Sequence, residues 1–181
     1  AGLDAKVITP ETTYYDAGFI ELSDYTIKNF DGRGRGTVGM QEVLSQSLNT
    51  GVAFITSRLG KDRFREYFYN LKLGTETGID LPNEGRGLIE NLKSPRELEY
   101  ATASFGQGIA LTPIATVRAL STLANGGTLV TPHITKSIEY KNGDVHEIGF
   151  ADGERVFSQE TSEDITRMLV TVVDTALKGG Q

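Results

Sequence analysis

Apolar side chains recur along most of this chain at the spacing of an α-helix, and residues that end helices separate the successive stripes. The first stripe follows Thr37, which we expect to cap a helix, and it breaks at Asn49-Thr-Gly51. Each stripe predicts a helix that packs one face on a common core. About five helices are expected near these stripes, which run from Met40 to Leu48, Val52 to Leu59, Phe64 to Leu71, Ile114 to Leu123 and Ile165 to Ala176, and a short helix is expected after the start signal Ser94-Pro95. Thr112, which precedes Pro113, and Ser158 are the expected starts of the last two helices.

Other segments depart from the helical spacing. Thr12-Thr-Tyr-Tyr15 and Phe19-Ile-Glu-Leu22 contain strand-forming residues, and Ser23-Asp24 bounds the second of them. Beyond Pro132 apolar residues alternate with polar ones, and Asn142-Gly143 is the dipeptide that best fits a two-residue hairpin turn. The sequence therefore predicts an α+β fold that is mostly α, with a small β-hairpin at Asn142-Gly143.

Composition narrows the classes of function. The net charge of -6 over 181 residues argues against a nucleic-acid partner, so we interpret Gly32-Arg-Gly-Arg-Gly36 as a flexible loop. The chain has no cysteine, and His133 and His146 are isolated in the sequence, so we expect no metal site and no cofactor. No apolar run approaches the roughly 20 residues that cross a bilayer.

The most informative polar residues are Ser47 and Asn49, in the triplet Ser47-Leu48-Asn49 at the break between the first two stripes. Serine and asparagine side chains compete for backbone hydrogen bonds, so they favour a corner between helices. Such a corner can direct a hydroxyl and an amide toward a ligand. Spacing alone favours an ordinary interhelical turn, because triplets of this kind are common.

Several further blocks follow one another along the chain: Gly36 to Gly51, Leu71 to Glu84, Ala103 to Pro113, Leu123 to Gly127, Pro132 to Glu139, Val156 to Ser158 and Met168 to Val173. In their residues and in their order these blocks resemble class B penicillin-binding proteins, which are monofunctional peptidoglycan D,D-transpeptidases. The resemblance implies the helical part of a penicillin-binding, β-lactamase-like transpeptidase domain.

Two further motifs of that family are not found in the sequence. No serine has a lysine three residues on, as S-x-x-K requires, and no lysine begins K-T-G or K-S-G. The resemblance implies that residues 1–181 are a partial transpeptidase domain, between S-x-x-K and K-T-G. The abrupt ends, Ala1-Gly-Leu-Asp and Lys178-Gly-Gly-Gln181, agree with this expectation.

The resemblance also implies roles for individual residues. Ser47 would hydrogen-bond the catalytic lysines and relay a proton to the leaving amine, and Asn49 would hold the amide of the stem peptide. Leu48 would be only a spacer. Phe105 and Gln107, in Phe105-Gly-Gln-Gly108, are further candidates for substrate binding, and a tight turn needed for packing is the alternative.

The intact parent would then cross-link peptidoglycan stem peptides that end in D-Ala-D-Ala, and β-lactams would acylate it. It would be anchored in the cytoplasmic membrane with this domain outside, while the segment alone would be soluble and inactive. A segment separated from the rest of its domain should expose the apolar residues 168–173 and self-associate. The alternatives are a non-catalytic β-lactam sensor, a cell-wall scaffold, or less well supported, a β-lactamase.

Overall fold

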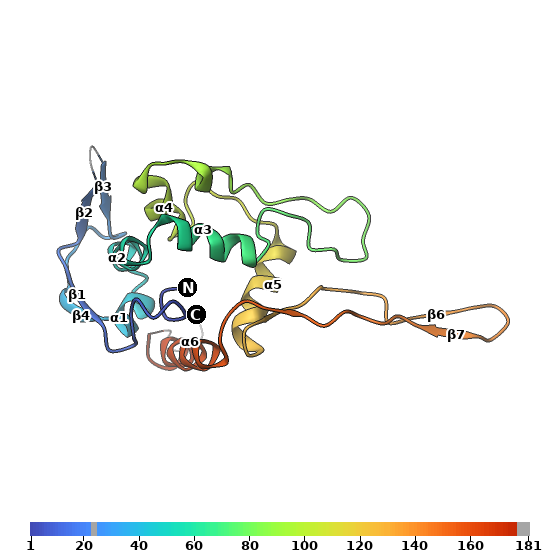
Figure 1. The fold of residues 1–181 in the computed structure, drawn as a ribbon. Helices are drawn as coiled ribbons and strands as arrows, with labels where there is room; N and C mark the ends of the chain where they lie inside the picture. The colour runs from blue at the N-terminus through green and yellow to red at the C-terminus, as the bar shows by residue number, and fades with distance from the viewer. Residues whose placement is uncertain (23–24, 177–181) are drawn as a thin grey trace.

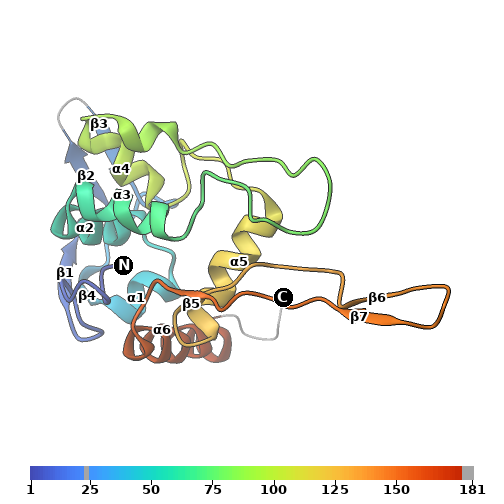
Figure 2. The same cartoon turned by 45° about the vertical axis from the view of Figure 1, so that its right-hand side comes forward.

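The computed structural model describes residues 1–22 and 25–176 (Figure 1). The turn expected at Ser23-Asp24, the side chain of Ala176 and the chain end from Lys178 to Gln181 lie outside the described residues. The N-terminal segment runs between one group of helices, α2 (Asn49–Leu59), α3 (Lys61–Asn70) and α4 (Glu97–Ala103), and another group, α1 (Met40–Ser45), α5 (Pro113–Ala124) and α6 (Gln159–Thr171), in both views (Figure 1, Figure 2).

The helices agree well with the predicted stripes. Thr112 and Ser158 cap their helices as expected, because each hydroxyl accepts a hydrogen bond from the backbone N–H three residues later. The α-helices are α1 (Met40–Ser45), α2 (Asn49–Leu59), α3 (Lys61–Asn70), α4 (Glu97–Ala103), α5 (Pro113–Ala124) and α6 (Gln159–Thr171); a 3-10 turn spans Glu90–Lys93 and a π-helical turn spans Val172–Ala176.

The strands form two-stranded antiparallel sheets. The hairpin at Asn142-Gly143 is confirmed, with β6 (Ser137–Glu139) paired to β7 (Val145–Glu147), and it projects far from the helices (Figure 1, Figure 2). Besides this hairpin, the described residues form further pairs: β1 (Thr13–Asp16) with β4 (Gly36–Gly39), β2 (Phe19–Leu22) with β3 (Tyr25–Lys28), and β5 (Thr128–Leu129) with β8 (Glu154–Arg155).

Two expected helix starts are wrong. Thr37 lies in β4 opposite Tyr15, and the first helix begins only at Met40, with Gly39 as its N-cap. Ser94 ends the 3-10 turn, and α4 begins at Glu97. At Thr37 pairing with a distant strand overrides the local cap signal.

The core has a cluster on each side of the N-terminal segment. Ile8, Tyr14, Met40, Val43 and Met168 join this segment to β1, α1 and α6. A second cluster joins α2, α3, the 3-10 turn and α4, and its buried members are Leu59, Phe64, Ile89, Leu92, Tyr100 and Ala103. On α6, Met168 is buried, whereas Leu169 and Val170 are exposed, and Val173 in the π-helical turn is exposed as well.

The base of the projecting hairpin is attached to the long loop after α3. Asp80 in this loop accepts hydrogen bonds from the backbone N–H groups of Ile134 and Thr135, both at 2.7 Å. Arg118 of α5 is buried below the loop, and its guanidinium donates to the carbonyl oxygens of Thr77 and Lys72, each at 3.1 Å. Asp80 thus attaches this loop to the base of the hairpin, and Arg118 attaches it to α5.

Candidate functional site

Ser47 lies in the turn between α1 and α2 with a left-handed backbone, at φ 51°. Its N–H bonds to the carbonyl of Leu44 at 3.2 Å, and the N–H of Leu48 bonds to the carbonyl of Val43 at 3.0 Å. These are the two hydrogen bonds of a Schellman motif, whose left-handed position is usually taken by glycine. A serine there is conformationally unfavourable, and such residues often occur at functional sites.

The three residues of the triplet differ in burial. Ser47 is exposed, Asn49 is half-buried, and Leu48 between them has only 1% of its surface exposed. The prediction that Leu48 is only a spacer is therefore wrong, because a buried leucine contributes about 1.5–3 kcal/mol of hydrophobic free energy. Leu48 anchors the corner in the core while its neighbours remain accessible.

The helix break lies at residues 46–48, so the expected interruption at Asn49-Thr-Gly51 is wrong. Asn49 is the first residue of α2, and Gly51 lies inside its first turn. A Cβ atom on Gly51 would lie 2.5 Å from Cγ2 and 2.7 Å from Cγ1 of Val43, far inside van der Waals contact. Gly51 is therefore explained by the close packing of α1 against α2.

The side chain of Asn49 is already oriented by a neighbouring segment. Its Nδ2 donates to the carbonyl oxygen of Lys28, at the end of β3, at 2.9 Å. This bond uses one of the two N–H donors of the amide and leaves the other N–H and Oδ1. The remaining pair can bind a peptide group through one donor and one acceptor.

Arg35 joins the glycine-rich loop before β4 to the same corner. Its Nε donates to Oε1 of Gln46, next to Ser47, at 2.7 Å, and its guanidinium pairs with Asp31 at 2.9 Å. The hydrogen bond from Arg35 lowers the pKa of Asp31 to about 2. The arginine proposed to lie in a flexible loop is thus held by defined partners.

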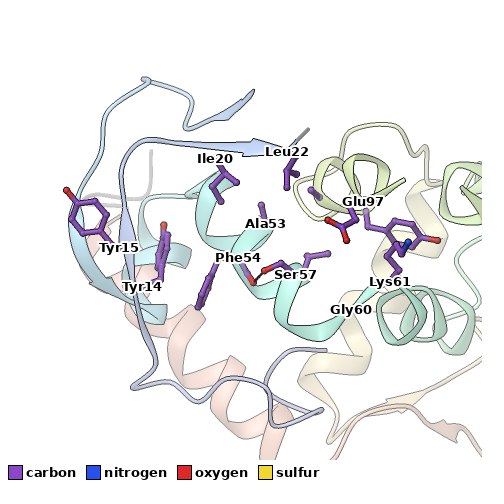
Figure 3. Close-up of a pocket in the computed structure, with 13 residues that line it drawn as sticks. Tyr14, Tyr15, Ile20, Leu22, Ala53, Phe54, Ser57, Gly60, Lys61 and Glu97 are labelled. Carbon is purple, nitrogen blue, oxygen red and sulfur yellow. Dashed lines mark hydrogen bonds between the residues drawn. The ribbon is translucent and has the colours of Figure 1, made fainter. Parts of the chain in front are cut away.

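Helix α2 also forms the floor of a groove of about 630 Å³ (Figure 3). Ala53 and Ser57 line it, and they follow Asn49 at intervals of four residues, so they share one face of α2 with it. Ile20 and Leu22 of β2 and Tyr100 of α4 line its sides, while Lys61 and Glu97 supply charged groups (Figure 3). The groove is mostly apolar.

Phe105 and Gln107 follow α4 in the turn 104–108. Phe105 packs against the cluster of Ile27, Ala53 and Ala101, to which α2 contributes Ala53. Gln107 is exposed, and its N–H bonds to the carbonyl of Thr102 at 3.0 Å. The structure brings Phe105 to this cluster, but it gives no contact between Gln107 and the Ser47 corner.

Comparison with protein families gives one match across this fold. The family model described as the penicillin binding protein transpeptidase domain matches residues 1–180. The chain belongs to the penicillin-binding protein transpeptidase family. Its resemblance to class B penicillin-binding proteins is confirmed by relatives named as peptidoglycan D,D-transpeptidases.

The curated relatives of this penicillin-binding protein chain are much longer than the chain. Stage V sporulation protein D of Bacillus subtilis is 34% identical over 94% of this chain and 27% of its own length. The FtsI homologue of Mesostigma viride, a peptidoglycan D,D-transpeptidase, is 31% identical over 75% of this chain and 25% of its own. The chain thus spans about a quarter of the length of the curated relatives it matches.

Solved penicillin-binding proteins share the fold. Penicillin-binding protein 3 of Mycobacterium tuberculosis, complexed with aztreonam, matches with a TM-score of 0.87 and 25% identity over 95% of this chain and 38% of that chain. The same protein complexed with ampicillin matches with a TM-score of 0.88 and 26% identity, over 96% and 38% of the two chains. The α+β transpeptidase fold expected from the sequence is confirmed.

Within residues 1–22 and 25–176, histidine, aspartate and glutamate side chains do not gather in groups of three that could hold a metal ion. None of the helices described has both the length and the apolarity to cross a membrane.

Proposed function

We propose that this chain is the part of a peptidoglycan D,D-transpeptidase that carries the Ser47-Leu48-Asn49 corner. The observation that carries the proposal is the family match over residues 1–180. The strained backbone of Ser47 supports it, because an exposed serine in a position suited to glycine is hard to explain by folding alone.

The proposed reaction is acyl transfer through a serine. The nucleophilic serine of S-x-x-K, supplied by the rest of the domain, attacks the peptide bond of D-Ala-D-Ala and releases the terminal D-Ala. The amine of a second stem peptide then attacks the acyl-enzyme ester, forms the cross-link and frees the serine. A β-lactam acylates the same serine when its ring opens.

The residues of this chain assist that reaction. Ser47 passes a proton between the catalytic lysines and the leaving amine, a task suited to a hydroxyl that both donates and accepts. Asn49 binds the substrate amide through the donor and acceptor that its bond to Lys28 leaves free. Phe105 and Gln107 complete the substrate surface, and the packing of Phe105 against the cluster that contains Ala53 of α2 supports its place there.

The whole protein is proposed to be anchored in the cytoplasmic membrane, with this domain on the outer side. The chain by itself is proposed to self-associate, since Leu169, Val170 and Val173 of the last helical segment are exposed. Sedimentation velocity of the isolated chain tests this proposal. A single monomeric species at high concentration would contradict it.

The test of function is intact-mass measurement after incubation with penicillin. A complete protein that contains this chain should gain the mass of one penicillin, and the adduct should map to the serine of S-x-x-K. The isolated chain should gain nothing, because no serine in it has the lysine partner of that motif. A complete protein that stays unmodified would favour the non-catalytic cell-wall scaffold.

A further inference from the structure

A buried polar cluster lies behind the Ser47 corner. Its members come from segments far apart in the sequence: Tyr14 and Asp16 from β1, Asn29 just after β3, and Thr50 from the first turn of α2. Asp16 and Thr50 have 1% of their surface exposed, and Asn29 has 4%. Burying so many polar groups is costly unless every one finds a partner.

Asp16 is the centre of the cluster. Its Oδ1 accepts from the hydroxyl of Thr50 at 2.8 Å and from the N–H of Gly18 at 2.9 Å, and its Oδ2 accepts from Nδ2 of Asn29 at 2.9 Å and from the N–H of Arg35 at 3.1 Å. A carboxylate that accepts from every neighbour fixes the orientation of each donor.

Asn29 links this carboxylate to the start of α2. The N-cap residue of α2 is Leu48, whose side chain cannot accept a hydrogen bond from the first turn. Asn29 supplies that acceptor from another segment, because its Oδ1 lies 3.2 Å from the N–H of Thr50. One residue earlier, the carbonyl of Lys28 holds the side chain of Asn49.

The hydroxyl of Thr50 is shared by several acceptors. It lies 2.8 Å from Asp16 Oδ1, 3.0 Å from Asn29 Oδ1 and 3.1 Å from the hydroxyl of Tyr14. Its single proton forms the shortest bond, to Asp16, and the Tyr14 hydroxyl donates to Thr50. Burial raises the pKa of Tyr14, so this hydroxyl keeps its proton over the physiological range.

We propose that Asp16 and Asn29 are positioning residues, which set the direction of Asn49 and Ser47 through Thr50 and the first turn of α2. The proposal rests on the function proposed above. The hydrogen bonds that join the residues of the cluster and their neighbour Lys28 to α2 all end at Asn49 and Thr50, whereas Tyr14 also stacks on Phe54 one turn later, with ring centroids 5.2 Å apart. A cluster that served only the core would have no need to supply a helix cap beside the candidate site.

The variants remove one link at a time in a complete transpeptidase that contains this chain. Thr50→Val keeps the shape of the side chain but removes the hydroxyl, whereas Thr50→Ser keeps the hydroxyl. Asn29→Ala removes the external cap of α2. Tyr14→Phe removes only a hydroxyl at the edge of the cluster. Its acylation can therefore still be measured if Thr50→Val and Asn29→Ala do not fold. Asp4→Asn controls for lost stability, because the partners of Asp4 are Tyr67, Ser158 and Thr161 and not the residues of the cluster.

The readout is the rate of acylation by a fluorescent penicillin, measured well below the melting temperature of each variant. Thr50→Val and Asn29→Ala should be acylated on the order of 10²-fold more slowly, as expected for a misplaced binding group. Thr50→Ser should be acylated at a rate within a few-fold of wild type, and Tyr14→Phe should be acylated only slightly more slowly than wild type. Asp4→Asn should keep the wild-type rate of acylation even if its melting temperature falls as far as those of Thr50→Val and Asn29→Ala.

Two different results would overturn the proposal, one for the positioning role alone and one for the proposed function as well. If wild type is acylated and the cluster variants slow no more than Asp4→Asn at equal loss of melting temperature, the cluster serves only the core. If wild type itself is not acylated, the proposed transpeptidase function fails and the positioning role falls with it.

Discussion

The carboxylate of Asp4 accepts a hydrogen bond of 2.7 Å from the backbone N–H of Ser158, although the two residues are 154 positions apart. It also accepts from the hydroxyls of Thr161 at 3.1 Å and Tyr67 at 2.6 Å. Burial raises the pKa of Asp4, but the hydrogen bonds from Ser158, Tyr67 and Thr161 outweigh it and leave the pKa below its usual range. One side chain thus joins the start of the chain to α3 and to the first turn of α6.

Asp4→Asn should therefore destabilise the fold. An asparagine cannot accept from all three donors, and each lost bond to a charged group costs on the order of 1–3 kcal/mol. Chemical denaturation should show a lower midpoint with an unchanged slope. The control is Asp152→Asn in an exposed loop, which should leave the midpoint unchanged. Equal midpoints for both variants would show that the Asp4 contacts contribute nothing.

Acid should release the loop that Asp80 attaches to the hairpin. Hydrogen bonds from the side chain and backbone of Thr135, and from the backbone of Ile134, lower the pKa of Asp80 to about 2. Because the folded pKa is depressed, the contribution of Asp80 is complete above the ordinary value of about 4 and is lost as pH falls toward 2.

NMR can follow this titration at the donors themselves. The amide protons of Ile134 and Thr135 should shift with a midpoint near pH 2, and in Asp80→Asn they should not follow that titration. A midpoint near the ordinary pKa of an aspartate would mean that the hydrogen bonds are absent in solution.

Ser47→Gly should separate folding from activity. Glycine suits the left-handed position, so the free energy of unfolding should stay unchanged or rise by about 1 kcal/mol. In a complete transpeptidase the same change removes the hydroxyl, and acylation should slow on the order of 10²–10⁴-fold. Ser47→Ala should slow acylation as much without the gain in stability. Near-normal acylation of both variants would show that the Ser47 corner is an ordinary turn with no role in acylation.

Gly51→Ala should destabilise the corner by overpacking. Its new methyl group would meet both Cγ atoms of Val43, so α1 and α2 must move apart, which typically costs about 1–3 kcal/mol. Gly149→Ala is the matched control, because nothing lies within 4 Å of a Cβ atom built there. Thermal melting measures both. A Gly51→Ala protein as stable as the control would show that Val43 moves aside at no cost.

Local signals predicted much of the fold. The caps at Thr112 and Ser158 and the hairpin at Asn142-Gly143 each depend on residues within a few positions of one another, so the sequence alone reveals them. The helix start predicted at Thr37 is wrong because the strand of Thr37 pairs with β1, more than twenty residues earlier, and no local sequence pattern indicates that pairing.

The candidate site was predictable only in part. Ser47 and Asn49 stand in a recognisable triplet, but Asp16 and Asn29 become neighbours only when β1 and the end of β3 meet behind α2. Their only local signal is a polar residue at the end of a strand-like run, which many surface residues share. The stripe Met40 to Leu48 predicted that Leu48 faces the core, but it did not show that the chain turns at residues 46–48.

If the complete protein is the transpeptidase proposed above, the buried position of Leu48 has a consequence for its response to β-lactams. Ser47 and Asn49 are joined to Leu48 by consecutive peptide bonds, so a shift of Leu48 within the core carries both polar side chains with it. Alleles that weaken the response to β-lactams could then arise at core positions that no drug molecule ever touches. Screens restricted to residues facing the cleft would pass over them.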